Sequence, residues 1–147
     1  MQVRELMTNR LAYCVPEANL EEVAEMMLKY DCGAIPVIDP ASEKALGLIT
    51  DRDIVCRAIA AHKTPSRVSA AEVMSEPVIA VRPESALDEC LSKMEAAQMR
   101  RMLVVDESGK LCGLVSQADI VRALPEHEIA ALLRDVSAPT AASAQAH

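Results

Sequence analysis

The sequence predicts a mixed α/β (α+β) protein in which two tandem β-α-β-β-α units pack face to face. Three observations lead to this expectation. Equivalent residues recur at a nearly constant offset, apolar residues follow helical spacing in some segments and strand-like runs in others, and 147 residues suffice for two small units with a core. Hydrophobic residues form 51% of the chain and charged residues 25%, an ordinary globular balance.

The internal repeat consists of residues that lie 67 positions apart in the first part of each unit and 66 apart in the second. The matched segments include Leu6-Met7-Thr8 with Val73-Met74-Ser75, Val37 with Val104, Gly47-Leu48-Ile49-Thr50 with Gly113-Leu114-Val115-Ser116, and Asp53-Ile54-Val55 with Asp119-Ile120-Val121. A deletion in the turn after Asp39 explains the change of offset, because turns tolerate changes in length. We therefore expect a first repeat at 1–61, a linker at 62–69 and a second repeat at 70–124.

Local patterns predict the elements of the first repeat in order. A short extended segment at 11–15 precedes Pro16, and apolar residues at helical spacing from position 20 to 28 indicate a helix. Asn19 followed by Glu22 is a signal for the start of that helix. The apolar runs 35–38 and 45–49 predict two strands joined as a hairpin, and a second helix is expected at 51–61.

The second repeat follows the same order. Ser85 and Asp88 form a predicted capping box, and apolar residues at 87, 90, 91 and 94 give the stripe of a helix. Strands are expected at 102–105 and 111–115, and a helix that begins at Asp119 is interrupted by Pro125. Beyond it, 125–136 predict an amphipathic helix that docks on the domain or on a second subunit, with a partner-specific helix as the alternative, and 137–147 predict a disordered tail.

Composition and charge disfavour several functions. The chain has no Trp or Phe, and its only aromatic residues are Tyr13 and Tyr30. This scarcity disfavours the stacking platforms of proteins that bind single-stranded nucleic acid or read RNA sequence. The formal net charge of −7 repels phosphate polymers, so no nucleic-acid polymer is expected as a partner. A pair of arginines can still hold one small anion.

The five cysteines are an odd set and show no Cys-x-x-Cys or Cys/His ligand spacing. The chain opens with no charged-then-apolar leader and has no run of about 18 apolar residues, so we expect a cytoplasmic protein with reduced thiols and no membrane partner. Small buried hydrophobes are the favoured interpretation of the cysteines, with a redox sensor or a metal site as alternatives. The three histidines show no metal pattern, so no metal ligand is assigned.

Two matched segments, Gly47 to Ile54 and Gly113 to Ile120, carry the chemistry. In each, a hydroxyl residue at a strand end is followed three positions later by an aspartate at a helix start; the pairs are Thr50 with Asp53 and Ser116 with Asp119. Either pair alone predicts a helix capping box. A strand-to-helix junction also presents free N–H groups and the positive end of a helix dipole. A carboxylate there can accept hydrogen bonds from both hydroxyls of a ribose diol. Two copies at equivalent places therefore predict a nucleoside or nucleotide site.

With these motifs in order twice, the sequence resembles the CBS domain family, named after cystathionine β-synthase. The resemblance covers residues 3–61 and 70–124 and rests on the segments 3–8, 35–39, 47–54, 71–75, 100–106 and 113–120. It implies a stand-alone pair of repeats arranged about a pseudo-twofold axis, which often dimerises, and hence a homodimer here. It also implies regulatory ligands in the clefts between the repeats, such as AMP, ADP, ATP or S-adenosylmethionine.

The resemblance further implies which residues contact a ligand. Asp53 and Asp119 would accept the ribose diol, and Thr50 and Ser116 would contact sugar or phosphate. The implied adenine edge and aliphatic walls are Leu11, Ala12, Ala34, Ile35, Pro36, Val78, Ile79, Met102 and Leu103. The implied phosphate contacts are Arg52, Arg100 and Arg101, because arginine offers a charged fork of donors.

The two copies differ in their basic residues. Arg100-Arg101 stands where the first repeat has Gly33-Ala34, and Arg52 stands where the second repeat has Ala118. The sequence leaves open which cleft gathers both basic groups. We expect one site to prefer phosphorylated ligands and the other to be weak or empty.

An enzyme is not expected, because no nucleophile has a base at recognisable spacing and no phosphate-cradling glycine loop or zinc spacing is present. No catalytic residue or catalytic cofactor is therefore assigned. The favoured function is a stand-alone module that senses adenine nucleotides or S-adenosylmethionine and signals energy or metabolite state to an unknown regulated protein. The alternatives are an interaction module that dimerises without a small ligand, and a cysteine-based redox sensor.

Overall fold

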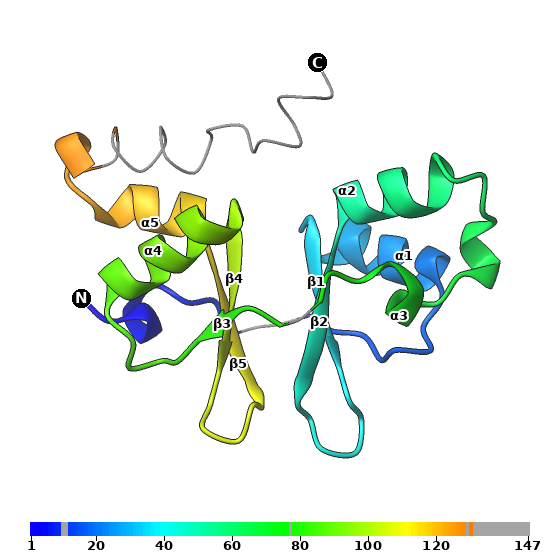
Figure 1. Ribbon diagram of the computed structural model, residues 1–147, viewed down its shortest axis with the longest axis horizontal. Coiled ribbons are helices and arrows are strands. Elements are labelled where there is room, and N and C mark those ends of the chain that lie inside the picture. The colour runs from blue at the N-terminus through cyan, green and yellow to red at the C-terminus, as the bar shows by residue number, and fades with distance from the viewer. Residues whose placement is uncertain (10–11, 77, 129, 131–147) are drawn as a thin grey trace.

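The computed structural model describes residues 1–9, 12–76, 78–128 and 130 of the chain. Two α/β halves lie side by side, with their sheets meeting at the centre and their helices on the outside (Figure 1). The first half contains α1 (Leu20–Tyr30), β1 (Ala34–Ile38), β2 (Ala45–Thr50), α2 (Asp51–Ile54) and the π-helical turn η2 (Val55–Ile59) that continues α2. The second half contains β3 (Ala80–Val81), α4 (Leu87–Ala97), β4 (Arg101–Val105), β5 (Leu111–Ser116) and α5 (Gln117–Ala123). The described residues also include the short elements η1 (Val3–Glu5), η3 (Pro65–Arg67) and α3 (Ala70–Val73).

The two hairpins share one register. β1 pairs antiparallel with β2, with Ala34 opposite Thr50, and β4 pairs antiparallel with β5, with Arg101 opposite Ser116. β3 joins the second sheet parallel to β4. In the first half, the described part of the extended segment expected at 11–15 contributes a single parallel bridge, from Cys14 to Val37. The predicted α/β (α+β) class, with two related units about a pseudo-twofold axis, is confirmed.

Each repeat begins on the opposite half of the molecule. Val3 of η1 is fully buried in the core of the second half, and its N–H donates to the Ser85 carbonyl at 3.0 Å. Ala70 and Val73 of α3 are likewise fully buried in the core of the first half. Figure 1 shows the exchange, because η1, in dark blue, lies with α4 and α5 while α3 lies with α1 and α2. The two repeats are therefore intertwined.

Apolar side chains form a core in each half and a smaller cluster between the two sheets. Alternate residues of a strand face opposite sides, so each central strand serves two cores. Ile35 of β1 and Met102 of β4 are fully buried in the cores of their own halves. Ala34, Leu48 and Leu103 form the buried cluster where the two sheets meet.

Of the capping contacts predicted for α1 and α4, the first is present and the second is not. At the start of α1, the Asn19 side chain accepts a hydrogen bond from the Glu22 N–H at 3.0 Å, as predicted. The capping box predicted for Ser85 and Asp88 is wrong. The residue before α4 is Ala86, and the Ser85 hydroxyl instead accepts the Arg82 N–H at 3.0 Å, because it lies one residue too early to cap the helix.

The C-terminal predictions fall mostly outside the described residues. Of the helix expected at 125–136, only 125–128 and 130 are described, and the tail expected at 137–147 lies wholly outside. Within the described ranges, no helix has the length and apolar character needed to cross a membrane.

Candidate functional site

The two predicted hydroxyl–carboxylate pairs form capping boxes at equivalent junctions of strand and helix. At the start of α2, the Thr50 N–H donates to Asp53 Oδ2 at 2.9 Å, and the Asp53 N–H donates to Thr50 Oγ1 at 3.1 Å. At the start of α5, the Ser116 N–H donates to Asp119 Oδ2 at 2.8 Å, and the Asp119 N–H donates to Ser116 Oγ at 3.1 Å. Each carboxylate is therefore fixed by both the strand and the helix that meet at its junction.

An arginine from the same helical segment faces the second oxygen of each carboxylate. Asp53 Oδ1 lies 3.9 Å from Arg57 Nε, and Asp119 Oδ1 lies 3.0 Å from Arg122 Nη2. The carboxylates still reach solvent, with side chains 13% and 21% exposed. A ligand that binds either aspartate would therefore share it with a cation already in place.

The glycine that opens each motif allows a close crossing of two backbones. A Cβ on Gly47 would lie 2.7 Å from Met74 Sδ and 2.9 Å from the Ser75 carbonyl oxygen. Gly113 has the equivalent close approach from residues 7–8 of the first repeat. Only a residue without a side chain fits so near another backbone. The crossing brings the start of one repeat to the capping junction of the other.

A cavity of about 250 Å³ lies between the repeats on the Asp53 side. It is lined by Leu48, Ser75, Glu76, Val78, Ile79, Ala97, Met99 and Leu103. Ser75 connects the cavity to the capping junction, because its hydroxyl donates to Asp53 Oδ2 at 3.4 Å. Leu48 belongs to the first repeat and the other lining residues to the second, so both repeats build the cavity.

Three of the predicted wall residues, Val78, Ile79 and Leu103, line this cavity. Sequence reasoning missed Ser75. The signal was present, since Ser75 matches Thr8 and the two repeats thus place a hydroxyl at the same point. Both residues pair with the hairpin of the opposite half through main-chain hydrogen bonds.

The remaining predicted apolar residues do not line this cavity. Ile35 and Met102 face the cores of their own halves, because they alternate with the strand positions that face the interface. Ala34 is buried in the cluster between the sheets. The other positions are Pro36, buried in β1, Ala12, half-buried against the first core, and Leu11, outside the described residues.

Of the three predicted arginines, Arg101 crosses to the opposite half. Its Nη2 atom lies 3.3 Å from the point that a Cβ on Gly33 would occupy, and Asp51 Oδ2 lies 3.0 Å from that same point. Arg101 opens β4 in the second half, whereas Gly33 and Asp51 belong to the first. Arg52 is exposed in α2, and Arg100 is exposed just before β4.

The thiols and histidines form no metal-binding cluster in the part of the chain that the structure describes. Burial raises the pKa of the Cys14 and Cys90 thiols to about 11, so both stay protonated near neutral pH. No group of three or more His, Cys, Asp or Glu side chains in these residues is placed to hold a metal ion.

Comparison with known proteins agrees with this architecture. The model of the CBS domain family matches residues 3–58 and 70–126. Hypoxic response protein 1 of Mycobacterium tuberculosis is 36% identical over 129 residues, which cover 87% of this chain and 89% of that protein. This chain belongs to the CBS domain family. Its two matches in tandem make it a CBS pair, and stand-alone CBS pairs are typically regulatory proteins.

Solved structures share the fold of this CBS pair. The crystal structure of Hypoxic Response Protein I with two coordinated zinc ions has a TM-score of 0.77 at 32% identity, covering 85% of this chain and 100% of that one. The CBS domain pair of protein MJ0100 in complex with 5′-methylthioadenosine and S-adenosyl-L-methionine has a TM-score of 0.74 at 24% identity, covering 84% and 94%. The second likeness shows the fold alone.

Proposed function

We propose that this CBS pair is a regulatory module that binds an adenine nucleoside ligand, such as AMP, ADP, ATP or S-adenosylmethionine, in the cleft between its repeats. One observation carries the proposal. The Asp53 carboxylate, fixed by a capping box, does not line the apolar cavity that both repeats build, but it accepts a hydrogen bond from Ser75, which does. The carboxylate can accept hydrogen bonds from a ribose diol. The aliphatic walls can pack against a purine base, although they offer no aromatic side chain for stacking.

The size of the cavity supports a small ligand. Its volume of about 250 Å³ is close to the lower end of ordinary ligand pockets, which is roughly 300 Å³. The solved CBS pair of protein MJ0100 holds two adenosine derivatives, which favours this ligand class. A zinc function is not proposed, because no metal-binding cluster exists among the described residues.

We further propose that the module acts in the cytoplasm as a homodimer and signals energy or metabolite state to a regulated protein. A ligand bound between the repeats can change how they pack only if it binds one packing arrangement more tightly than another. Leu28 of α1 and Val55 and Ile59 of η2 are large apolar side chains that are more than half exposed, which supports a contact surface on the helices of the first half. A single dimer-sized species in light scattering tests the assembly, and a monomer at all concentrations contradicts it.

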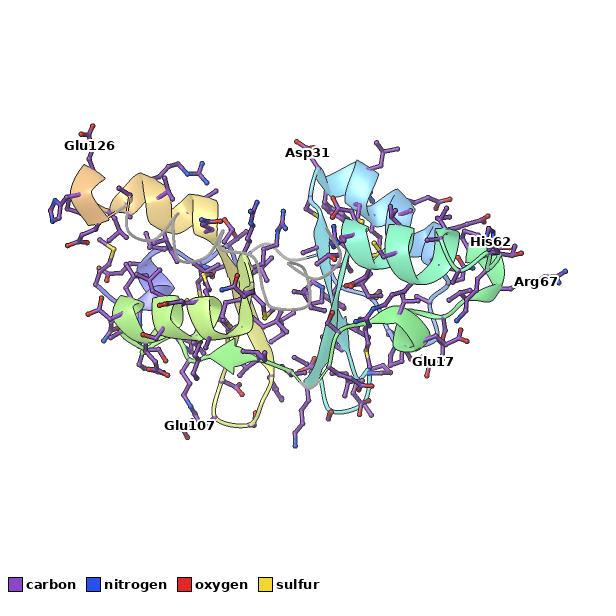
Figure 2. The ribbon with its side chains drawn as sticks, turned by 45° about the horizontal axis from the view of Figure 1, so that its top comes forward. Glu17, Asp31, His62, Arg67, Glu107 and Glu126 are labelled. Atoms are coloured by element: carbon purple, nitrogen blue, oxygen red, sulfur yellow. The ribbon has the colours of Figure 1, made fainter. Side chains whose placement is uncertain are left out.

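Isothermal titration calorimetry tests the binding proposal. AMP, ATP and S-adenosylmethionine are titrated into the wild type, Asp53→Asn, Asp119→Asn and the control Glu107→Gln, whose side chain lies at the tip of a hairpin (Figure 2). We expect at least one ligand to bind the wild type with a submillimolar Kd. At least one aspartate variant should weaken it tenfold or more, whereas the control should not.

Failure of every ligand to bind the wild type below millimolar concentration overturns the proposal. An unchanged melting temperature with all of these ligands would then favour the alternative, an interaction module that dimerises without a small molecule.

A further inference from the structure

We infer that Arg57 is a positioning residue that links the Asp53 carboxylate to the opening segment of the second repeat, residues 70–76, so that a ligand on Asp53 changes how the two repeats pack. Asp119 has no such link among the described residues. The inference rests on the proposed function and deepens it, because it assigns the regulatory signal to one of the two clefts.

Arg57 holds the end of α3. It lies in η2, the π-helical turn that continues α2. Its Nη1 atom donates to the carbonyl of Val73 at 3.2 Å and to that of Met74 at 3.3 Å. The last carbonyls of a helix have no partner within the helix, and a basic side chain beside them can supply one. Arg57 therefore fixes the opening segment of the second repeat on the helices of the first half.

The same guanidinium faces Asp53. Its Nε atom lies 3.9 Å from Asp53 Oδ1, an oxygen that accepts no hydrogen bond from any residue that the structure describes. The other oxygen, Oδ2, accepts the Thr50 N–H at 2.9 Å and the Ser75 hydroxyl at 3.4 Å. One carboxylate thus holds the opening segment twice, directly through Ser75 and indirectly through Arg57. Oδ1 is the oxygen left for a ligand hydroxyl, and a hydroxyl there competes with Arg57.

The opening segment crosses the first sheet at close range. Met74 Sδ and the Ser75 carbonyl oxygen lie 2.7 and 2.9 Å from the place of a Cβ on Gly47. Ser75 and Leu48 exchange main-chain hydrogen bonds, and both residues line the cavity. Closely packed groups transmit a displacement to their neighbours. When a ligand weakens the hold of Asp53 on Arg57, the end of α3 therefore loosens and the crossing of the two repeats shifts.

The arginine at the second junction stays within its own helix. Arg122 Nη2 lies 3.0 Å from Asp119 Oδ1, and Arg122 Nε donates to the Ala118 carbonyl at 3.2 Å. All three residues belong to α5. The sequence repeat places Ala123, not an arginine, at the position of Arg57. The charge of Asp119 is therefore balanced without a contact to the start of the first repeat.

Thr8, the equivalent of Ser75, does not contact Asp119 through its side chain either. Among the described residues, Thr8 forms hydrogen bonds only with Leu114, and only through main-chain groups. The first repeat thus crosses the second sheet without a side-chain link to the capping carboxylate. We therefore assign the signal to the Asp53 cleft.

Hydrogen exchange measured by mass spectrometry tests the link without a ligand. We expect Arg57→Ala to speed exchange of residues 70–76 about tenfold or more, because the end of α3 loses its donor. Arg57→Lys keeps the charge without the fork, so it should recover part of the protection. The control Arg67→Ala, whose side chain points away at the far end of the first half, should leave this exchange unchanged (Figure 2). Each variant is measured at the same interval below its own melting temperature.

Double variants separate a link from two independent contacts. Asp53→Asn keeps an oxygen for the cap but removes the charge that Arg57 faces, so it mimics the occupied carboxylate and should also speed exchange. In Arg57→Ala/Asp53→Asn, the increase should be smaller than the product of the two single increases. Asp119→Asn should leave exchange of residues 3–9 within about twofold of the wild type. Increases that multiply, or equal loosening of residues 3–9 in Asp119→Asn, overturn the inference.

AMP serves as the probe of the ligand's effect. In the wild type, saturating AMP should speed exchange of residues 70–74 about threefold or more. Arg57→Ala should bind AMP with a Kd no more than about threefold higher and should show no such response, which a purely structural role would not explain. No response in the AMP-bound wild type, or the same response in Arg57→Ala, overturns the inference. If AMP does not bind the wild type, the proposed function fails for this ligand, while the ligand-free measurements still decide whether Arg57 links the repeats.

Discussion

At the scale of single residues, the carboxylates of Asp53 and Asp119 each cap a helix and still reach solvent. One carboxylate oxygen closes a capping box, and the other faces an arginine. The sequence alone predicts the cap, because a hydroxyl and a carboxylate three residues apart are its signature. Asp53 also contacts Ser75, which belongs to the start of the second repeat. This contact between the two repeats is seen only in the folded chain.

Gly47 gives a stability prediction at the same scale. Gly47→Ala places a methyl group 2.9 Å from the Ser75 carbonyl oxygen, so the crossing backbones must separate. We expect the free energy of unfolding to fall by about 1–3 kcal/mol, measured by urea denaturation. Ser92→Ala on the exposed face of α4 is the control and should change it by less than about 0.5 kcal/mol. Equal stability of Gly47→Ala and the wild type would show that the crossing is loose.

The buried thiols give a second residue-scale prediction. Burial raises the pKa of Cys14 and Cys90 to about 11, and both are almost fully buried, so neither should react with a thiol reagent in the folded protein near neutral pH. Exposed Cys56 serves as the internal control and should be labelled without denaturant. Mass spectrometry after brief labelling, with and without urea, measures the difference. Rapid labelling of Cys14 or Cys90 in the native protein would revive the redox-sensor alternative.

At the scale of elements, the turns of the two hairpins share a hydrogen-bonded aspartate. The Ala41 N–H donates to the Asp39 carboxylate and lowers its pKa, and the Ser108 hydroxyl does the same for Asp106. Asp39 and Asp106 lie 67 residues apart, and each carboxylate accepts the N–H two residues later, so the contact recurs in two turns that differ in length by one residue. These turns were expected from the sequence, but the hydrogen bonds that hold them were not specified.

The pH dependence of stability follows from these turns. A lowered pKa in the folded state means that the unfolded chain binds protons more readily, so the contribution is present above the ordinary pKa of 3.8 and is lost as the pH falls through the folded value. We expect the Asp39→Asn/Asp106→Asn variant to lose less stability than the wild type between about pH 5 and pH 3. Urea denaturation at both pH values measures this. Glu107→Gln is the charge control, and an identical loss in the double variant and the wild type would contradict the account.

Elements of regular periodicity were predictable, and those that depend on partners were not. The strands 35–38 and 45–49 and the Asn19 cap follow from local pattern, and the structure extends the strands by only a residue at one end. Ile35 was expected in the cleft and faces a core instead, because the pattern of a fully apolar strand does not reveal which face meets which layer. The crossing of Arg101 to the first half depends on the pseudo-twofold packing, which no local pattern encodes.

On the scale of the whole molecule, the exchange of starting segments explains why a ligand site lies between the repeats. Residues 1–9 pack on the second half and α3 on the first, so each start crosses the hairpin of the opposite half near a capping aspartate. The cavity at Asp53 lies at one such crossing, with walls from both repeats. A ligand there contacts both halves at once, and its binding free energy acts on their packing.

The decisive measurement for a ligand site between the repeats is a set of crystal structures of the protein grown in turn with AMP, ATP and S-adenosylmethionine. We expect density for at least one of these ligands in the Asp53 cleft, with the base among Val78, Ile79 and Leu103, the ribose hydroxyls on Asp53, and a phosphate, where the ligand has one, on Arg101. A cleft that stays empty with every one of these ligands at millimolar concentration would overturn the proposed function.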